Sequence, residues 1–120
     1  MTNLYCGACI DLLCGIKSLF KSNFGADLDK VHRDIYMDLT GRRCFADAND
    51  EQCVQQTPSV LLVLTPPCHD YSSSNPNPKG KDGQHGGCEF ANIPGLVKKH
   101  RPLWVLIEEV GDGINYKEEL

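Results

Sequence analysis

The apolar run at residues 60–64, which ends against two prolines, most strongly constrains what this chain can fold into. Five consecutive aliphatic residues predict a strand that is buried on both faces, as in a parallel sheet. Proline lacks the backbone N–H that a strand ladder needs, so the strand must end before Pro66 and Pro67. Cys68 follows at once, in a polar segment. The sequence therefore predicts a thiol just beyond a strand's carboxyl end, where open α/β sheets bind their ligands.

Length, charge and cysteine content narrow the class of protein. A chain of 120 residues forms one domain that buries about two-thirds of its unfolded surface. Its net charge of −4 is unlike that of a free-standing nucleic-acid binder, which usually carries a basic patch. The sequence contains neither a membrane span nor a signal peptide, and its seven cysteines are an odd number, so we expect reduced thiols in an intracellular protein. That location is the nucleus if the source is eukaryotic and the cytoplasm if it is prokaryotic or viral.

Apolar runs alternate with helix-like segments along the chain. We expect strands at residues 9–13, 26–29, 43–46, 60–64 and 102–107, and helices at residues 16–20, 30–39, 49–56 and 90–99. The second helix has Val31, Ile35 and Leu39 on one face, and Trp104 is expected in the core. The polar residues 72–87 predict a long mobile loop. This alternation predicts an α/β fold with a mostly parallel sheet and helices on both faces.

Acidic or thiol groups recur where the expected strands end. They are Asp11, Asp27, Asp47, Cys68 and Glu108. A thiolate can add to a carbon of an electron-poor ring while a carboxyl group holds a proton on a ring nitrogen. Cys68 and Glu108, on neighbouring strand ends, would suit that chemistry. The alternative is that Cys68 is a small apolar residue after a turn and that Glu108 is a solvated charge.

Three segments, in order, resemble one family. Residues 66–72 (PPCHDYS) resemble the Pro-Cys-Gln-x-Phe-Ser nucleophile motif of the C5-cytosine methyltransferases. Residues 101–110 (RPLWVLIEEV) resemble that family's Arg-Pro…Glu-Asn-Val segment, and residues 11–16 (DLLCGI) are similar to its opening Asp-Leu-Phe-x-Gly motif. The resemblance implies a Rossmann-like S-adenosylmethionine-dependent methyltransferase fold that is incomplete at the C-terminus. Residues 1–120 would be the amino-terminal part of the catalytic domain, without a target-recognition domain.

The resemblance also implies an activity and a set of site residues. Cys68 would attack C6 of a flipped-out cytosine in DNA, Glu108 would engage N3 and the exocyclic amine, and C5 would take the methyl group of S-adenosylmethionine. The implied cofactor-binding residues are Asp11, Leu13, Gly15, Asp27, Asp47 and Pro67. The loop that closes over the nucleic acid would use Ser72, Lys79 and Lys81. RNA is the alternative substrate, and a complementary polypeptide supplying the missing motifs is a further expected partner.

Two other functions remain open from the sequence. Lys17 and Ser18 stand where the family has Gly-Gly, and Glu109 stands where it has Asn, which favours a non-catalytic remnant or scaffold of the same fold. The pair Cys6 and Cys9 would suit a thiol-redox protein, although a redox pair normally opens a helix rather than leading into a strand. No metal is expected, because the remaining cysteines and histidines lack the usual zinc-ligand spacing.

Overall fold

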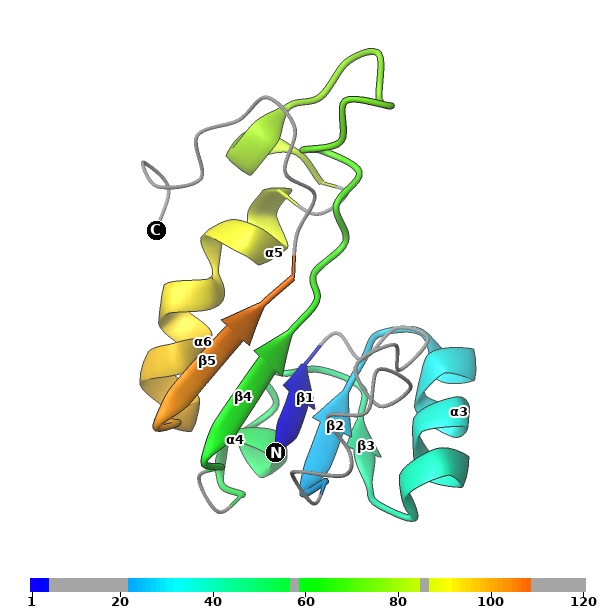
Figure 1. Ribbon diagram of the computed structural model, residues 1–120, viewed down its shortest axis with the longest axis vertical. Helices are drawn as coiled ribbons and strands as arrows, with labels where there is room; N and C mark the ends of the chain where they lie inside the picture. Colours follow the sequence, from blue (N-terminus) through cyan, green and yellow to red (C-terminus); the bar gives the residue numbers. More distant parts are fainter. Residues whose placement is uncertain (5–21, 57–58, 85–86, 109–120) are drawn as a thin grey trace.

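The structure, a computed structural model, describes residues 1–4, 22–56, 59–84 and 87–108. Its strands form one parallel five-stranded sheet in the order β3-β2-β1-β4-β5 (Figure 1). The strands are β1 (Thr2–Leu4), β2 (Phe24–Ala26), β3 (Cys44–Phe45), β4 (Leu61–Leu64) and β5 (Trp104–Ile107). The helices are α3 (Lys30–Thr40), α4 (Glu51–Val54), α5 (Gly87–Ala91) and α6 (Ile93–His100), with a 3₁₀ turn η1 at Gly80–Asp82. The expected α/β class and parallel pairing are therefore confirmed.

The amino-terminal half differs from the expected element positions. The first strand of the sheet is Thr2–Leu4, not residues 9–13, and it occupies the central position between β2 and β4. The burial of its side chains agrees with the central position, because Thr2 and Leu4 are fully buried and a central strand is covered on both faces. Residues 9–13 and 16–20 lie outside the described part of the chain. The second strand ends at Ala26, so Asp27 follows it rather than lying within it.

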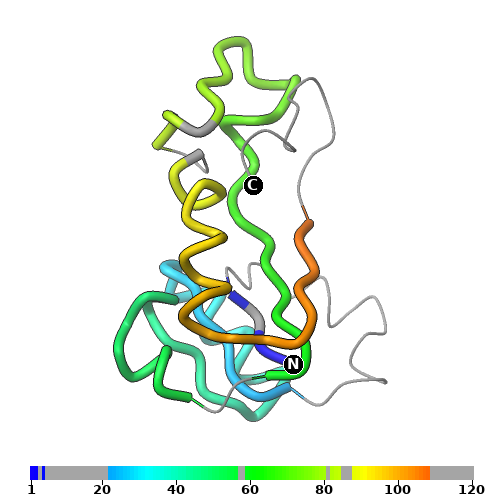
Figure 2. The backbone as a smooth tube through the Cα atoms, turned by 90° about the vertical axis from the view of Figure 1, so that its left-hand side faces the viewer, coloured from blue at the N-terminus to red at the C-terminus, as the bar shows by residue number. Residues whose placement is uncertain are grey.

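The core lies on both faces of the sheet, because alternate residues of β4 point to opposite sides. Leu62 and Leu64 belong to one buried cluster, which includes Phe90 from α5 together with Ile93 and Leu96 from α6. Val63 belongs to a second cluster with Met1 and Tyr36, the latter from α3. Figure 2 shows α6 running along one side of β4 and β5. Strand β4 thus contributes side chains to the buried cluster with α5 and α6 on one face and to the buried cluster with Tyr36 of α3 on the other.

Helix α3 packs on the sheet through Tyr36, not through the face that the apolar spacing suggested. Val31, Ile35 and Leu39 are exposed, whereas Tyr36 is completely buried. The reason is a close approach at Gly25 in β2, where an added Cβ would lie 2.9 Å from Cζ of Tyr36. The missing side chain of Gly25 leaves the space that the tyrosine ring fills. The helix ends at Thr40, one residue beyond the expected end, where Gly41 adopts φ 64° and its N–H donates to the Met37 carbonyl.

This close approach predicts that Gly25→Ala lowers the free energy of unfolding. The buried ring of Tyr36 has no solvent to move into, and overpacking of this kind costs about 1–3 kcal/mol. Urea unfolding followed by circular dichroism measures the change. Gly95→Ala is the matched control, because the atom nearest to its new Cβ belongs to the exposed side chain of Asn92. Equal stability of Gly25→Ala and the wild-type protein would contradict this packing.

Two expectations for the carboxyl-terminal half also need correction. The single helix expected at residues 90–99 is two helices that meet at Asn92, and Pro94 lies in the first turn of the second, α6. Strand β5 forms as expected but is not buried, and Trp104 is 69% exposed rather than part of the core. The exposure of β5 arises from its position in the fold, because it is the last strand in the described sheet order. None of the described helices is long and apolar enough to cross a membrane.

Candidate active site

The predicted functional residues collect at one edge of the sheet. Asp27 follows β2, Asp47 lies two residues after β3, Cys68 lies four residues after β4, and Glu108 follows β5 directly. Because all five strands are parallel, their carboxyl ends meet at the same edge. Asp11, Leu13 and Gly15 lie outside the described residues. The recurrence of acidic and thiol groups at strand ends, noticed in the sequence, therefore places four of these groups along one edge.

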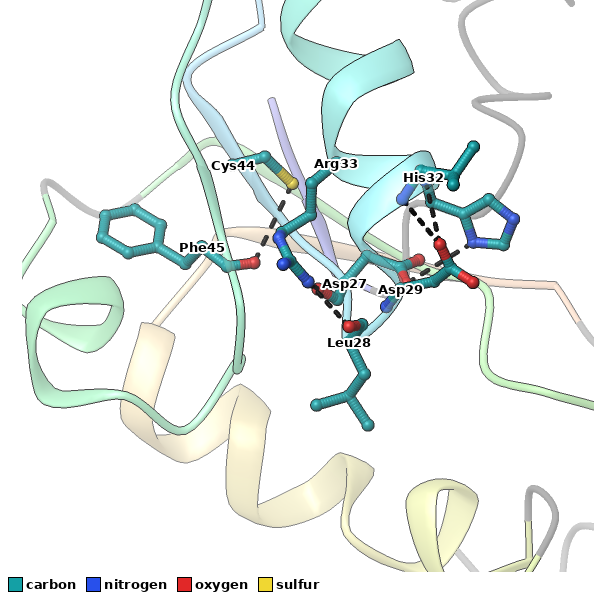
Figure 3. A network of polar contacts seen from close by, with 8 residues as sticks. Asp27, Leu28, Asp29, His32, Arg33, Cys44 and Phe45 are labelled. Atoms are coloured by element: carbon teal, nitrogen blue, oxygen red, sulfur yellow. Dashed lines mark hydrogen bonds and ion pairs between the residues drawn. The ribbon is translucent and has the colours of Figure 1, made fainter.

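The turn from β2 to α3 is held rigid by its own polar contacts (Figure 3). Asp27 accepts a hydrogen bond from the N–H of Asp29 at 2.8 Å, and its carboxylate lies 3.5 Å from Nδ1 of His32. Asp29 caps the helix by accepting from the N–H of Val31, and hydrogen bonds to this carboxylate hold its pKa below the usual range. Arg33 donates to the carbonyls of Asp27 and Leu28. The carboxylate of Asp27 thus has a defined position at the end of β2.

Two neighbouring cavities open at this edge. The first, of about 310 Å³, lies between the ends of β2 and β3. The second, of about 390 Å³, extends from the end of β2 to the segment that follows β4. Asp27, Leu28 and Glu89 line both cavities. The first is further lined by Ala26, Ala46, Asp47, Ala48, Asn49, Cys88 and Asn92, and the second by Asp29, His32, Thr65 and Pro67. The two cavities are therefore adjacent, with Asp47 in the lining of the first and Pro67, the residue before Cys68, in the lining of the second.

The loop after β3, which lines the first cavity, is fastened to the end of α6. Nε2 of His100 lies 3.0 Å from the carbonyl oxygen of Ala48, and Nζ of Lys99 donates to Oδ1 of Asn49 at 2.6 Å. His100 is buried, and its ring lies 6.1 Å from that of Phe24. Burial lowers the pKa of His100, and this outweighs the opposing effect of the hydrogen bond to Ala48. The imidazole is therefore neutral at neutral pH, and its N–H donates to the carbonyl.

This lowered pKa predicts a loss of stability in mild acid. The unfolded chain takes up a proton on His100 near pH 6.5, the ordinary histidine value, whereas the folded protein resists protonation. Stability is therefore complete above that pH and falls as the pH drops from about 6.5 toward the lower pKa of the folded state. The urea concentration at the midpoint of unfolding of the wild-type protein should decrease as the pH is lowered from about 7.5 to about 5.5. His100→Gln should flatten this dependence, whereas His69→Gln, a change at an exposed histidine, should leave it intact.

The segment carrying Cys68 is anchored on both sides of the thiol. Pro66 is buried before it, and the carbonyl of Cys68 accepts hydrogen bonds from the N–H groups of Tyr71 and Ser72. The buried ring of Tyr71 lies 5.1 Å from that of Phe90 in α5. Cys68 itself is half-buried. The thiol thus lies in a tight turn that is packed against a helix, rather than in an unsupported loop.

The other described thiols differ from Cys68 in ways that make them poorer nucleophiles. Burial raises the pKa of Cys53 to about 12. A hydrogen bond to Glu89, 2.9 Å from the sulfur, raises the pKa of Cys88. Because the thiolate is the reactive form, the raised pKa makes each of these two thiols less reactive at neutral pH than an ordinary cysteine. Cys44 lies within β3, which leaves Cys68 as the described thiol that stands beyond a strand end.

A third cavity, of about 400 Å³ and mostly polar, lies within the segment that follows Cys68. It is lined by His69, Asp70, Asn75, Asn77, Lys79, Asp82 and Gln84. Lys79 is exposed, and Ser72 is half-buried in the turn after Cys68. Lys81 belongs to η1, within the segment expected to be an unstructured loop. Pro67 and His69, the two neighbours of Cys68 in the chain, thus line different cavities.

Glu108 is exposed, and its N–H donates to the Leu64 carbonyl at 3.0 Å. This bond sets Glu108 beside the end of β4, on the strand next to the one that leads to Cys68. That the sulfur and this carboxyl group face a common space stays a prediction. Sequence reasoning missed Glu89 and Asn49 as cavity residues. The Asp47-x-Asn49 turn, in which Asp47 accepts from the N–H of Asn49, offered a local signal for Asn49. The residues around Glu89 in the sequence give no sign that its side chain lines a cavity with residues of β2.

Comparison with known proteins adds no family to this geometry. No family model matches the chain, and no curated protein matches it significantly. Within the described residues, no three histidine, cysteine or acidic side chains group as a metal site. Any assignment of function must therefore come from the strand-end residues and the cavities beside them.

Proposed function

We propose that this protein transfers a methyl group from S-adenosylmethionine to C5 of cytosine in DNA through a covalent intermediate at Cys68. The observation that carries the proposal is a row of two adjacent cavities along the strand ends, the first lined by Asp47, the second by Pro67 beside Cys68, and both by Asp27. A single elongated ligand lying in it would have one end at the first two strands and the other end near the thiol. A cofactor that delivers a group to a base held at Cys68 has this shape.

The sheet order supports a nucleotide-type cofactor. The order β3-β2-β1-β4-β5 reverses direction between β1 and β4, and doubly wound folds bind their ligands where the strand order reverses. Within the α/β class, we propose that the fold is of the Rossmann-like methyltransferase type. It agrees with the resemblance of residues 66–72 and 101–110 to the C5-cytosine methyltransferases.

The residues of the first cavity suit the adenosine part of the cofactor. Asp27 and Asp47 bring carboxylate oxygens, which accept hydrogen bonds from ribose hydroxyls and from an adenine amine. Ala26, Ala46 and Ala48 have small apolar side chains that leave space for a flat ring. When bound, S-adenosylmethionine would supply an electrophilic methyl group on its sulfonium.

The chain's own groups would perform the remaining steps. Cys68, as the thiolate, forms a bond to C6 of the base, and the displaced electron pair makes C5 nucleophilic. Glu108 holds a proton at N3 and so stabilises the charge that develops on the ring. After the methyl group has bonded to C5, a base from solvent takes the C5 proton, and the electron pair of that C–H bond re-forms the C5–C6 double bond and breaks the bond from C6 to sulfur, which restores the thiolate of Cys68. The base must leave the duplex for this attack, and the segment with Ser72, Lys79 and Lys81 would cover it.

Trapping of the covalent intermediate tests the proposal. A DNA oligonucleotide containing 5-fluorocytosine, with S-adenosylmethionine, should form a protein–DNA adduct, because fluorine at C5 prevents the final loss of a proton. Peptide mass spectrometry should locate the adduct at Cys68. Cys68→Ser should abolish it, and Cys44→Ser, which alters another half-buried thiol, should retain it. Equal trapping by Cys68→Ser would end the proposal, and a folded protein that binds no S-adenosylmethionine would instead support a non-catalytic scaffold.

A further inference from the structure

We propose that the exposed edge of β5 pairs with β5 of a second copy of this chain, in antiparallel orientation, so that two sheets join into one. The first observation is exposure. Strand β5 is four apolar residues long, and Trp104, Val105 and Leu106 are all exposed, as is Leu103 before it. Because alternate residues point to opposite faces of a sheet, exposed apolar side chains lie on both faces of β5. Exposed apolar edges of this kind mark association sites.

The two edges of the sheet differ in how they are protected. Strand β3, at the opposite edge, has only two residues, and the guanidinium of Arg43 lies 4.3 Å from the centre of the Phe45 ring. Short strands and nearby charges are the usual ways of keeping an edge from pairing. Strand β5 is twice as long and has neither proline nor charge between Trp104 and Ile107. One edge is thus blocked, and the other is suited to pairing.

The backbone of β5 has hydrogen-bonding groups directed to its outer side. The N–H groups of Trp104 and Glu108 donate to the Val60 and Leu64 carbonyls on the β4 side. Since these directions alternate along a strand, the N–H and C=O groups of Val105 and Ile107 point away from β4. No described strand lies there. A second β5 centred on Val105 would exchange both hydrogen bonds of that residue with its counterpart.

Charge at the two ends of β5 selects a second copy in antiparallel orientation. Arg101 precedes the strand, and Glu108 follows it. An antiparallel pair about a two-fold axis brings the basic end of each strand to the acidic end of the other. A parallel pair would set like charges side by side, which is unfavourable. The strand is therefore complementary to itself in one orientation only.

Sedimentation velocity over a range of protein concentrations tests this pairing. The mass should rise from 13.3 kDa toward twice that value, and added salt should weaken the dimer because the end charges are screened. Val105→Lys sets two ammonium groups opposite each other at the axis and should leave a monomer. Val31→Lys makes the same change at an exposed valine on α3 and should dimerise like the wild-type protein.

A second variant separates pairing from folding. Val105→Pro removes an N–H that points outward, so the ladder to β4 keeps its bonds while the new pair loses a donor. This variant should melt as a folded protein and remain monomeric. A wild-type protein that stays monomeric at every concentration would overturn the proposal. Equal dimerisation of the Val105→Lys and Val31→Lys proteins would overturn it as well.

Discussion

Phe90→Ala should lower the free energy of unfolding by about 3–5 kcal/mol, the usual cost of removing a fully buried aromatic side chain. Phe90 is 1% exposed, and it belongs to the cluster that joins α5 and α6 to β4. A domain of this size has a total stability of about 5–15 kcal/mol, so the variant should be partly unfolded at moderate temperature. Urea unfolding measures this loss. Val31→Ala, on the exposed face of α3, should change stability by less than about 0.5 kcal/mol.

The same variant should loosen the segment that carries the thiol. Tyr71 packs on Phe90 and donates its backbone N–H to the Cys68 carbonyl, so removal of the ring takes away the support of that turn. Hydrogen exchange should then increase at residues 68–72 more than in α3, which packs on the opposite face through Tyr36. Unchanged protection at residues 68–72 would show that the turn holds without this contact.

Asp27→Asn should weaken the binding of S-adenosylmethionine by roughly 10- to 100-fold, the range expected for loss of a charged hydrogen-bond acceptor. The amide keeps the shape of the side chain and an oxygen for the N–H of Asp29, so the turn at the end of β2 should survive. Only the charge at the wall shared by the two cavities is removed. Calorimetric titration measures the affinity.

The control for this variant is Asp34→Asn, the same change on the surface of α3. Asp34 pairs with Lys30 one helical turn away and is half exposed, so cofactor affinity should stay as in the wild-type protein. Affinity that is unchanged in the Asp27→Asn protein, with circular dichroism showing a normal fold, would remove Asp27 from the proposed cofactor site. The Cys68 adduct experiment would still stand, because it reports on a different residue.

Local patterns in the sequence predicted the elements whose signals lie within a few residues. The prolines after β4 end that strand, Gly41 ends α3 in the left-handed conformation, and Pro94 lies in the first turn of α6. These outcomes depend on backbone geometry alone, through a fixed φ, a missing N–H or a positive φ. The same patterns predicted that Asp27, Asp47, Cys68 and Glu108 lie at strand ends, and parallel pairing places them along one edge.

The burial of side chains was decided by tertiary structure. The spacing of Val31, Ile35 and Leu39 predicted a packed helix face, but the gap at Gly25 turns Tyr36 inward instead. The apolar residues of β4 and β5 look alike in sequence, yet β4 is covered by helices on both faces, whereas β5 lies at an edge.

The contacts of the candidate site show the same division. Glu89 lines the cavity at the end of β2. His100 donates a hydrogen bond to the carbonyl of Ala48, a residue 52 positions earlier in the chain. By itself, the sequence determined where strands stop and which chemical groups follow them, because turns and caps depend on neighbouring residues. Only the folded structure decided which of those groups share a cavity and which apolar residues remain exposed, because both depend on the order of strands that are distant in sequence.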